Sequence, residues 1–449
     1  MTGLRRAMGG HDVVLFLVAA VVGLRWIATA AAAGPSSLVI WLGAFVAFFI
    51  PLAFTVIELS ARYPQEGGLY VWVKLAFGDF AGFMGSWMYW TSNLVYLPGL
   101  LYFSAGNALF MGGPSWQSLN DSPRYYVIAS LGGLGVAFAL NIVGLGVGKW
   151  LHNAGGIGSW VPILILVIMS AIALGRFGPA SDFGGGALIP ATGMKDIAFW
   201  STIAFGFAGL ETASFMGDEI RDAPRTLPRA ILTAGAIITA IYILGTAAIL
   251  VALPPGQVSG LQGITQAISA TADRIGTPFL GPLLALLITI GNVGGVGAWL
   301  ASMARLPFTA GIDRLLPPAF ARLHPRWGTP HVALLVQGAG AALFVVLGQA
   351  GTDVKGAYDV LVGIAVITNF IPYLLMFAAL IRLVRRPLAI ALAVLGLAVT
   401  AVAIVLATLP PEDSTDPALA VVKVVGSTVG LVVVGAGLFA LGRRRARRA

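Results

Sequence analysis

The chain has 449 residues, of which 58% are hydrophobic and 10% are charged, and its mean hydropathy is +0.90. A soluble globular protein carries about 25% charged residues, so this composition excludes a soluble enzyme, a nucleic-acid-binding protein and a disordered scaffold. The net charge of +9 includes five arginines in the last seven residues, directly after an apolar run. Such clusters are typical of the cytoplasmic flank of a membrane span. No cysteine is present and the four histidines are widely separated, so we expect neither a metal site nor a cofactor.

Long apolar runs predict an all-α polytopic membrane protein. A helix needs about 20 mainly apolar residues to cross the hydrocarbon core, and about twelve such runs are present. The expected spans are 13–33, 38–60, 80–111, 124–146, 153–175, 197–220, 229–253, 279–305, 330–348, 357–383, 388–409 and 418–442.

The distribution of lysine and arginine predicts the orientation. With the N-terminus inside, the inner segments hold twenty of the 27 basic residues and the outer segments hold six. Basic residues concentrate in cytoplasmic loops, so we expect both termini in the cytoplasm and the protein in the cell membrane. Arg5 and Arg6 before the first run also fit a secretory signal, but cleavage would leave an odd number of spans, and we expect a retained helix. The polar-rich outer segment 254–278 predicts a short interfacial helix.

Two ionisable residues lie well inside predicted spans, Arg25 in the first and Glu211 in the sixth. An unpaired charge facing lipid would cost roughly 2.5–3.5 kcal/mol on an insertion scale. We therefore expect both side chains to face the bundle interior, a water-filled cavity or each other.

Glycines beside both charges predict interrupted helices. Gly23 precedes Arg25, and Gly206 and Gly209 precede Glu211, about five spans later. Interrupted helices at matched places in two halves indicate a transporter with inverted repeats, although such glycines also permit close helix packing. We expect facing breaks near 22–24 and 207–210. The first repeat would cover 1–196, the second 197–386, and two further helices with a basic tail 387–449.

Four motifs give the chain a resemblance to a known family. Residues 58–70 read ELSARYPQEGGLY, residues 218–230 read DEIRDAPRTLPRA, residues 311–318 read GIDRLLPP after Trp299, and residues 371–374 read IPYL. In this order they are similar to motifs of the amino acid–polyamine–organocation (APC) transporters, the family of the bacterial arginine:agmatine exchanger. The resemblance covers about residues 4–441. It implies a core of five plus five helices in inverted repeats, two further helices, and alternating access around a central site.

The resemblance also implies a substrate site at the two breaks. Helix N-termini favour anions and free carbonyl groups accept ammonium protons. The amides expected to bind the substrate carboxylate are those of Val21, Val22 and Gly23. The backbone expected to receive the amino group is that of Phe205, Ala208 and Gly209.

Side chains of further helices complete the implied pocket. Trp299 and Phe205 fall on the family's aromatic wall positions, and Asn93, Leu97 and Ala365 fall on other pocket positions. Four further aromatic residues of the third span are interpreted, for the most part, as core or interfacial belt; they are Trp87, Tyr89, Trp90 and Tyr96. For Asn292 a helix–helix hydrogen bond is at least as good an interpretation as ligand binding.

Arg25 departs from the family pattern, as does Val21-Val22-Gly23 where the family has Gly-Ser/Ala-Gly. A fixed positive charge disfavours arginine, agmatine and other cations by like-charge repulsion. We therefore expect neutral or acidic amino acids as substrates, carried by proton-coupled symport or by exchange. The partners expected are the substrate, the lipid bilayer and protons, without nucleic acid, and no particular oligomeric state is predicted.

Arginine effectively cannot lose its proton, so proton switching would belong to Glu211. Our hypothesis is that Glu211 titrates during transport while Arg25 pairs with it in one state. Alternatively, Arg25 binds a substrate carboxylate, or occupies a cation site and makes transport sodium-independent.

Other functions remain as alternatives. A channel needs a continuous charged or carbonyl-lined path, whereas the charges here are isolated; a carrier of another organic solute, such as a polyamine, is a further alternative. A membrane enzyme needs clustered acid, base or nucleophile groups. The only dense cluster follows the sixth span, where a salt-bridged gate or a solvated surface fits better, so we expect no enzymatic activity; it comprises Asp218, Glu219, Arg221, Asp222 and Arg225.

Overall fold

The computed structural model describes residues 9–63, 68–143, 145–191, 193–212, 214, 220–304, 315–410 and 416–446. The regular elements of these residues are helices. Ten of them are long and apolar enough to cross a membrane, and the bent pair α1 and α2 makes an eleventh span. The predicted span 197–220 begins as α10, and its last part lies outside the described residues. The predicted all-α membrane architecture is confirmed.

The helix bounds follow the predicted spans closely. The long helices and half-helices are α1 (Gly10–Val21), α2 (Leu24–Ala32), α3 (Ser36–Ala44), which continues through the wider turn η1 (Phe45–Phe49) into α4 (Ile50–Arg62), α6 (Asp79–Ala108), α8 (Pro123–Val143), α9 (Leu145–Phe177), α10 (Met194–Gly206), α11 (Ala223–Ala252), α13 (Leu280–Met303), α15 (His331–Gln349), α16 (Val354–Leu383), α17 (Pro387–Ala407) and α18 (Pro417–Ala446). The shorter helices are α5 (Leu69–Phe77), α7 (Pro114–Gln117) and α12 (Gly263–Ile275), with single turns η2 (Leu109–Met111), η4 (Pro255–Gln257) and η5 (Pro318–Ala321).

The first span is broken where the sequence predicts it. Val22 and Gly23 have extended backbone, with ψ angles of 110° and 118°, between the end of α1 and the start of α2. The two half-helices meet with a bend of 48°. Because the first N–H groups of a helix have no acceptor within it, this break leaves backbone donors free in the middle of the bundle.

The sixth span is interrupted as well. α10 ends at Gly206, and the chain then turns through residues 207–209. Gly209 has a φ angle of +120°, a conformation that residues with a Cβ atom rarely adopt. A Cβ atom at Gly209 would lie 3.3 Å from a methyl group of Val21. The two breaks are therefore adjacent in space, and the start of the predicted break at 207–210 is confirmed.

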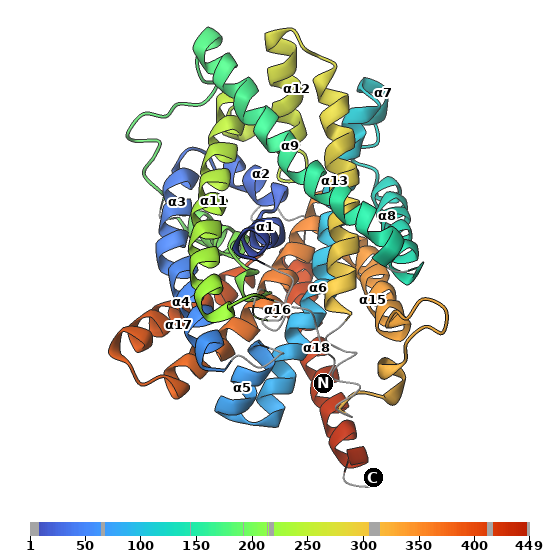
Figure 1. Ribbon diagram of the computed structural model, residues 1–449. Coiled ribbons are helices and arrows are strands. Elements are labelled where there is room, and N and C mark those ends of the chain that lie inside the picture. The colour runs from blue at the N-terminus through green and yellow to red at the C-terminus, as the bar shows by residue number, and fades with distance from the viewer. Residues whose placement is uncertain are drawn as a thin grey trace.

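α6 and α16 form the centre of the bundle, where they pack side by side (Figure 1). The protein buries 78% of the apolar stretch of α6 and 67% of that of α16. The corresponding shares are 28% for α17 and 22% for α18. A helix that is apolar on all sides and little buried by protein must face lipid. α17 and α18 therefore lie at the periphery, as expected of two helices added to a core.

α9 and α13 pack with their backbones in direct contact. A Cβ atom at Gly291 would lie 2.6 Å from the carbonyl carbon of Gly158, and one at Gly158 would lie 2.5 Å from the Cα atom of Gly291. Small residues at such crossings let membrane helices approach closely. Neither glycine can be enlarged without separating the two helices.

The short helix predicted in segment 254–278 is α12. Together with α7 it lies at the end of the molecule opposite α5 and the end of α18 (Figure 1). Its apolar face, which includes Ile264, Ala267 and Ile268, is buried against α2, α9 and α13. α12 therefore covers α2, the second half of the broken first span, by packing on protein.

Candidate substrate site

A small, partly open cavity lies beside the two breaks. The α1–α2 break, α6, the end of α10, α13 and α16 all contribute to its wall. The lining residues are Ala20, Val21, Trp26, Tyr89, Asn93, Tyr96, Phe205, Ala208, Gly209, Trp299 and Asn369.

The structure brings about half of the sequence-predicted site residues to this cavity. Those that line it are Val21, Asn93, Phe205, Ala208, Gly209 and Trp299. Leu97 instead packs in an apolar cluster between α6 and α13. Ala365 is buried in the main core, and Asn369, one turn further along α16, lines the cavity in its place. Val22 and Gly23 form the break itself, and Arg25 and Glu211 lie behind the cavity wall.

The sequence interpretation missed two tyrosines that line the cavity. Tyr89 and Tyr96 are assigned above to core or belt, yet both share one face of α6 with Asn93. Residues at positions i, i+4 and i+7 of a helix point the same way. This spacing around Asn93 was a usable signal for both tyrosines. Ala20, Trp26 and Asn369 carried no comparable signal.

Aromatic side chains form the walls of the cavity. The rings of Trp26 and Phe205 meet edge to face with centroids 5.2 Å apart, and those of Tyr96 and Trp299 lie 5.6 Å apart. Such pairs give a large apolar contact area with fixed geometry. The walls can therefore enclose an apolar part of a ligand, while polar groups at the breaks orient it.

Tyr242 of α11 joins the two breaks. Its hydroxyl oxygen accepts a hydrogen bond from the Gly23 N–H group at 3.2 Å, and it lies 2.7 Å from the carbonyl oxygens of both Val21 and Gly206. A hydroxyl group carries one proton, so it donates to one of these carbonyl groups at a time. Its ring stacks on Trp41 with centroids 4.2 Å apart. Tyr242 was not among the sequence-predicted residues, because a single tyrosine in an apolar span gives no signal.

The free amides at the first break lie slightly later than the resemblance implies. The Val22 N–H group donates to the Val18 carbonyl at 3.0 Å, and the Gly23 N–H group donates to Tyr242. Across the described residues, no hydrogen bond is found for the N–H groups of Leu24 and Arg25. The free N–H groups at the start of α2 thus begin one or two residues after the predicted positions.

Glu211 is fully buried beside the cavity. Its Oε1 atom accepts a hydrogen bond of 2.7 Å from the hydroxyl group of Tyr89, and its Oε2 atom is buried without a hydrogen-bond partner. The Tyr373 hydroxyl group accepts a hydrogen bond from Gly209 N–H at 3.0 Å and lies close enough to interact with the Glu211 carboxyl group. Tyr89 contacts Glu211 directly and Gly209 contacts it through Tyr373. A change in the protonation of Glu211 would therefore affect the hydrogen bonds of two residues in the cavity wall.

The side chain of Arg25 is also buried, with 2% of its surface exposed. Its guanidinium carbon lies 4.2 Å from the ring centroids of both Trp26 and Tyr96. Within the described part of the chain no ion pair joins Arg25 to Glu211. The hypothesised pairing is therefore absent from this conformation, in which aromatic rings take the place of a carboxylate.

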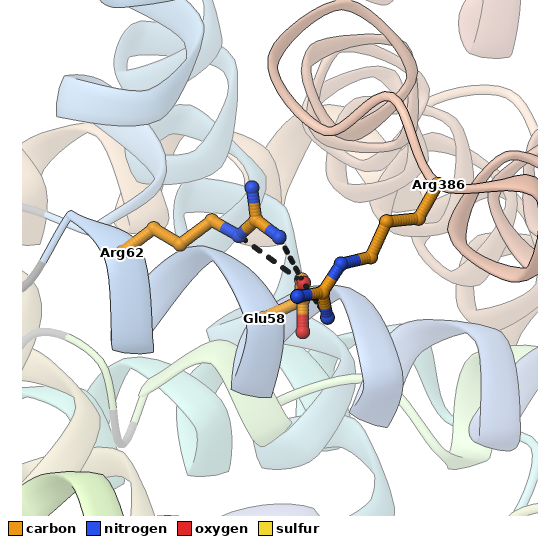
Figure 2. Close-up of polar contacts among 3 residues, drawn as sticks. All are labelled: Glu58, Arg62 and Arg386. Carbon is orange, nitrogen blue, oxygen red and sulfur yellow. Dashed lines mark hydrogen bonds and ion pairs between the residues drawn. The ribbon is translucent and has the colours of Figure 1, made fainter.

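A separate ion-pair cluster lies at the α5 end of the bundle. Glu58 of α4 accepts hydrogen bonds from Arg62 at 2.7 and 3.1 Å and from Arg386, just before α17, at 3.4 Å. Figure 2 shows the two guanidinium groups converging on one carboxylate. Glu58 is the least exposed of the three, with 17% of its side chain accessible. The cluster links α4 to the α16–α17 connection.

Two minor expectations from the sequence have different outcomes. In the cluster after the sixth span, Asp222 and Arg225 form an exposed ion pair of 3.7 Å, which fits a solvated surface, while Asp218 and Glu219 lie outside the described residues. The Nδ2 atom of Asn292 is buried without a hydrogen-bond partner. The expected helix–helix hydrogen bond from this amide is thus not formed.

Comparison with known proteins places the chain among transporters. Residues 9–436 match the family model described as amino acid permease. The chain is 28% identical to an uncharacterized transporter of Legionella pneumophila over 84% of this chain and 81% of that protein. It is 26% identical to the probable agmatine/putrescine antiporter AguD of Lactococcus lactis, over 71% of this chain and 67% of that protein. It is 22% identical to the glutamate/serine transporter AimA of Bacillus subtilis, over 74% and 64%.

These matches agree with the bundle of membrane-spanning helices and with the interrupted first span. The family match extends over nearly the whole chain, including every element that lines the cavity. The chain belongs to the amino acid permease family and is a multi-pass membrane transporter, not an enzyme.

Proposed function

We propose that the protein is a secondary active transporter of amino acids that works by alternating access around the cavity. The observation that carries this proposal is the meeting of two interrupted helices at one cavity. Such half-helix ends bind the charged groups of a substrate near the membrane midplane. An amino acid carries an anionic and a cationic group a few bonds apart. These two groups match the start of α2 and the turn after α10, which meet at the cavity.

The two ends have different chemistry. The free amides at the start of α2, next to the break at Val22 and Gly23, favour the substrate carboxylate. The turn after α10, with Phe205, Ala208 and Gly209, would receive the amino group. Asn369 supports this assignment, because its Oδ1 atom is buried without a hydrogen-bond partner in the cavity wall. The aromatic walls would hold the remaining part of the substrate.

Glu211 is the group that we assign to proton coupling. As a carboxylate it accepts the Tyr89 hydrogen bond, and after protonation its O–H becomes a donor itself. The change would alter the orientation of Tyr89 in the cavity wall. Among the described residues no hydrogen bond is found for Oε2, so a proton on this atom would leave the hydrogen bond from Tyr89 to Oε1 in place. Proton-coupled symport and exchange both remain compatible with this arrangement.

The proposal includes the organisation of the chain. Residues 1–196 and 197–386 would form the two inverted repeats, each beginning with an interrupted helix, and 387–449 the peripheral helices. The excess of basic residues on inner segments supports cytoplasmic termini in the cell membrane. The basic cluster Arg443–Arg445 at the end of α18 supports the same orientation.

Polyamine transport is the second candidate, favoured by the similarity to AguD. The charge of Arg25 opposes it, because a polyamine would bring further positive charge next to a buried cation. The similarity to AimA points instead to neutral and acidic amino acids. We therefore favour neutral or acidic amino acids.

Counterflow in liposomes tests the proposal. Reconstituted protein should take up labelled amino acid in a saturable and stereoselective way, and more strongly when the liposomes contain unlabelled substrate. Asn93→Leu, in the cavity wall, should weaken uptake. Asn292→Leu, at a comparably buried asparagine outside the cavity, should leave it intact. Non-saturating uptake would indicate a channel, and uptake of polyamines without amino acids would favour the second candidate.

A further inference from the structure

The guanidinium group of Arg25 is a buried positive charge, and no described carboxylate forms an ion pair with it. It lies in the first turn of α2, and 2% of the residue is exposed. Glu211, the other ionisable residue predicted inside a span, accepts a hydrogen bond from Tyr89 and forms no ion pair with Arg25 among the described residues. A buried ion is costly unless it is paired and hydrogen-bonded. The site of Arg25 is therefore electrostatically incomplete in this conformation.

Aromatic rings compensate for only part of this cost. The guanidinium carbon lies 4.2 Å from the centroids of Trp26 and Tyr96, which satisfies the cation through the ring faces. Its hydrogen-bond donors are not compensated in this way, because Nε and Nη2 are buried and no hydrogen bond is found for them among the described residues. The hydroxyl group of Tyr358 on α16 interacts electrostatically with Arg25 and with the Thr29 side chain. Two donors of the guanidinium group thus lack an acceptor in the part of the chain that the structure describes.

The aromatic contacts of Arg25 do not prevent a carboxylate from binding it. The two rings lie against the guanidinium group, whereas a carboxylate binds a guanidinium group along its planar edge through two parallel hydrogen bonds. Both kinds of contact are compatible with each other. Gly99 allows the guanidinium group to pack closely on α6, because a Cβ atom there would lie 2.9 Å from the Nη1 atom of Arg25.

The same two rings form part of the cavity wall. Trp26 and Tyr96 line the cavity, and the guanidinium group lies directly behind their rings, so a rotation of either side chain would bring it into contact with a bound ligand. Its position near Gly99 of α6 and Tyr358 of α16 differs from that of the free amides at the start of α2. A substrate whose α-carboxylate binds these amides could therefore place a second anionic group at Arg25.

We propose that Arg25 binds the side-chain carboxylate of the substrate, and that the transported substrates are acidic amino acids. This inference rests on the proposed amino acid transport and narrows its substrate class. A dicarboxylic amino acid supplies the missing counter-charge, so the loaded cavity contains an ion pair in place of an isolated cation. A neutral amino acid leaves the cation unpaired, and a cationic one adds repulsion.

The first experiment compares ligands on the unaltered protein. Equilibrium binding in detergent should show glutamate or aspartate bound about 100-fold more tightly than glutamine or asparagine, which have the same shape without the charge. This factor corresponds to about 2.7 kcal/mol, the contribution of one hydrogen bond to a charged group. Arginine and agmatine should bind more weakly still. Equal affinity for each acid and its amide would overturn the inference.

The second experiment changes the charge of residue 25. Arg25→Met retains much of the aliphatic stem and should raise the dissociation constant of glutamate about 100-fold, while that of glutamine changes less than about threefold. Arg25→Lys retains the charge without the planar fork and should lie between the two. An equal loss for both ligands would assign Arg25 to the α-carboxylate or to structure, and would overturn the inference. If Arg25→Met does not fold, the ligand comparison and Arg25→Lys still decide.

Two further outcomes are distinguishable. The first outcome is that sodium chloride stabilises the protein in a saturable way and sodium gluconate does not, while glutamate binds no better than glutamine. Arg25 would then bind an inorganic anion, and the inference fails. If liposomes show counterflow of neutral amino acids but not of acidic ones, the inference fails while the proposed function stands. If no amino acid is transported, the proposed function itself fails.

Discussion

Tyr242→Phe removes a single oxygen atom from the point where the two breaks meet. The ring should remain in place, because it stacks on Trp41 at 4.2 Å and is fully buried. The substitution therefore deletes the hydroxyl contacts to Gly23, Val21 and Gly206 without creating a large cavity. Any effect on transport can be attributed to the loss of this link.

The size of the effect follows from the groups left unpaired. The Gly23 N–H group loses its acceptor, and one carbonyl group, of Val21 or Gly206, loses its donor. A buried polar group without a partner costs about 1–3 kcal/mol. Because the Gly23 contact is only part-buried, we expect the two losses together to lower the free energy of unfolding by about 2–4 kcal/mol. The start of α2 also loses its fixed position, so substrate affinity should fall about tenfold or more.

Thermal unfolding and substrate binding, measured on the same purified protein, test this prediction. Tyr102→Phe is the matched control, because its equally buried hydroxyl group contacts the Val345 carbonyl and the Gln349 side chain of α15, each at 3.2 Å and outside the cavity lining. The control should lose stability but keep its affinity. If Tyr242→Phe keeps wild-type affinity, or differs from the control in neither measurement, the link between the breaks has no role in substrate binding.

Three further predictions concern other parts of the protein. Trp299→Ala should weaken substrate binding about tenfold or more while the protein still inserts and folds, because Trp299 forms part of the cavity wall; unchanged binding and transport would remove it from the site. Glu211→Gln should abolish the pH dependence of transport and still bind substrate, and a wild-type pH profile measured by uptake would make Glu211 structural. Glu58→Gln removes the ion pairs to Arg62 and Arg386 and should lower stability by about 0.2–1 kcal/mol per pair at low salt. Thermal unfolding in about 1 M salt should no longer distinguish this variant from wild type, and a persistent difference would show that Glu58 acts by other means.

The membrane fold was largely predictable, because hydropathy and length determine where a helix can span lipid. The break near Gly23 was predictable because a glycine weakens a helix, and a helix broken at mid-membrane depth is tolerated only where its free backbone is buried in protein or lines a cavity. The short helix α5, directly before the central α6, was not predicted. α5 begins at the end of the motif at residues 58–70. This motif indicates the family but does not specify the local backbone conformation.

The site was predictable at the level of helices and less so at the level of residues. A shift of one position separates Leu97 from Tyr96, and one helical turn separates Ala365 from Asn369. Similarity of motifs aligns helices only approximately, whereas a change of one residue rotates a side chain by about 100° around a helix. The bond network of Tyr242 depends on contacts between distant segments, and no local pattern encodes such contacts.

The close contact of α9 and α13 has a practical consequence for following the motion of this transporter. With Gly158 against Gly291, the two helix backbones are in direct contact, and sliding or separating them would break this close packing, so we expect them to move as a single body while other helices move. Since the natural chain contains no cysteine, single cysteines can be introduced for spectroscopic labels without first removing any. A label pair placed on the lipid-facing sides of α9 and α13 should report the same separation with and without substrate, and can serve as an internal ruler for distances measured elsewhere.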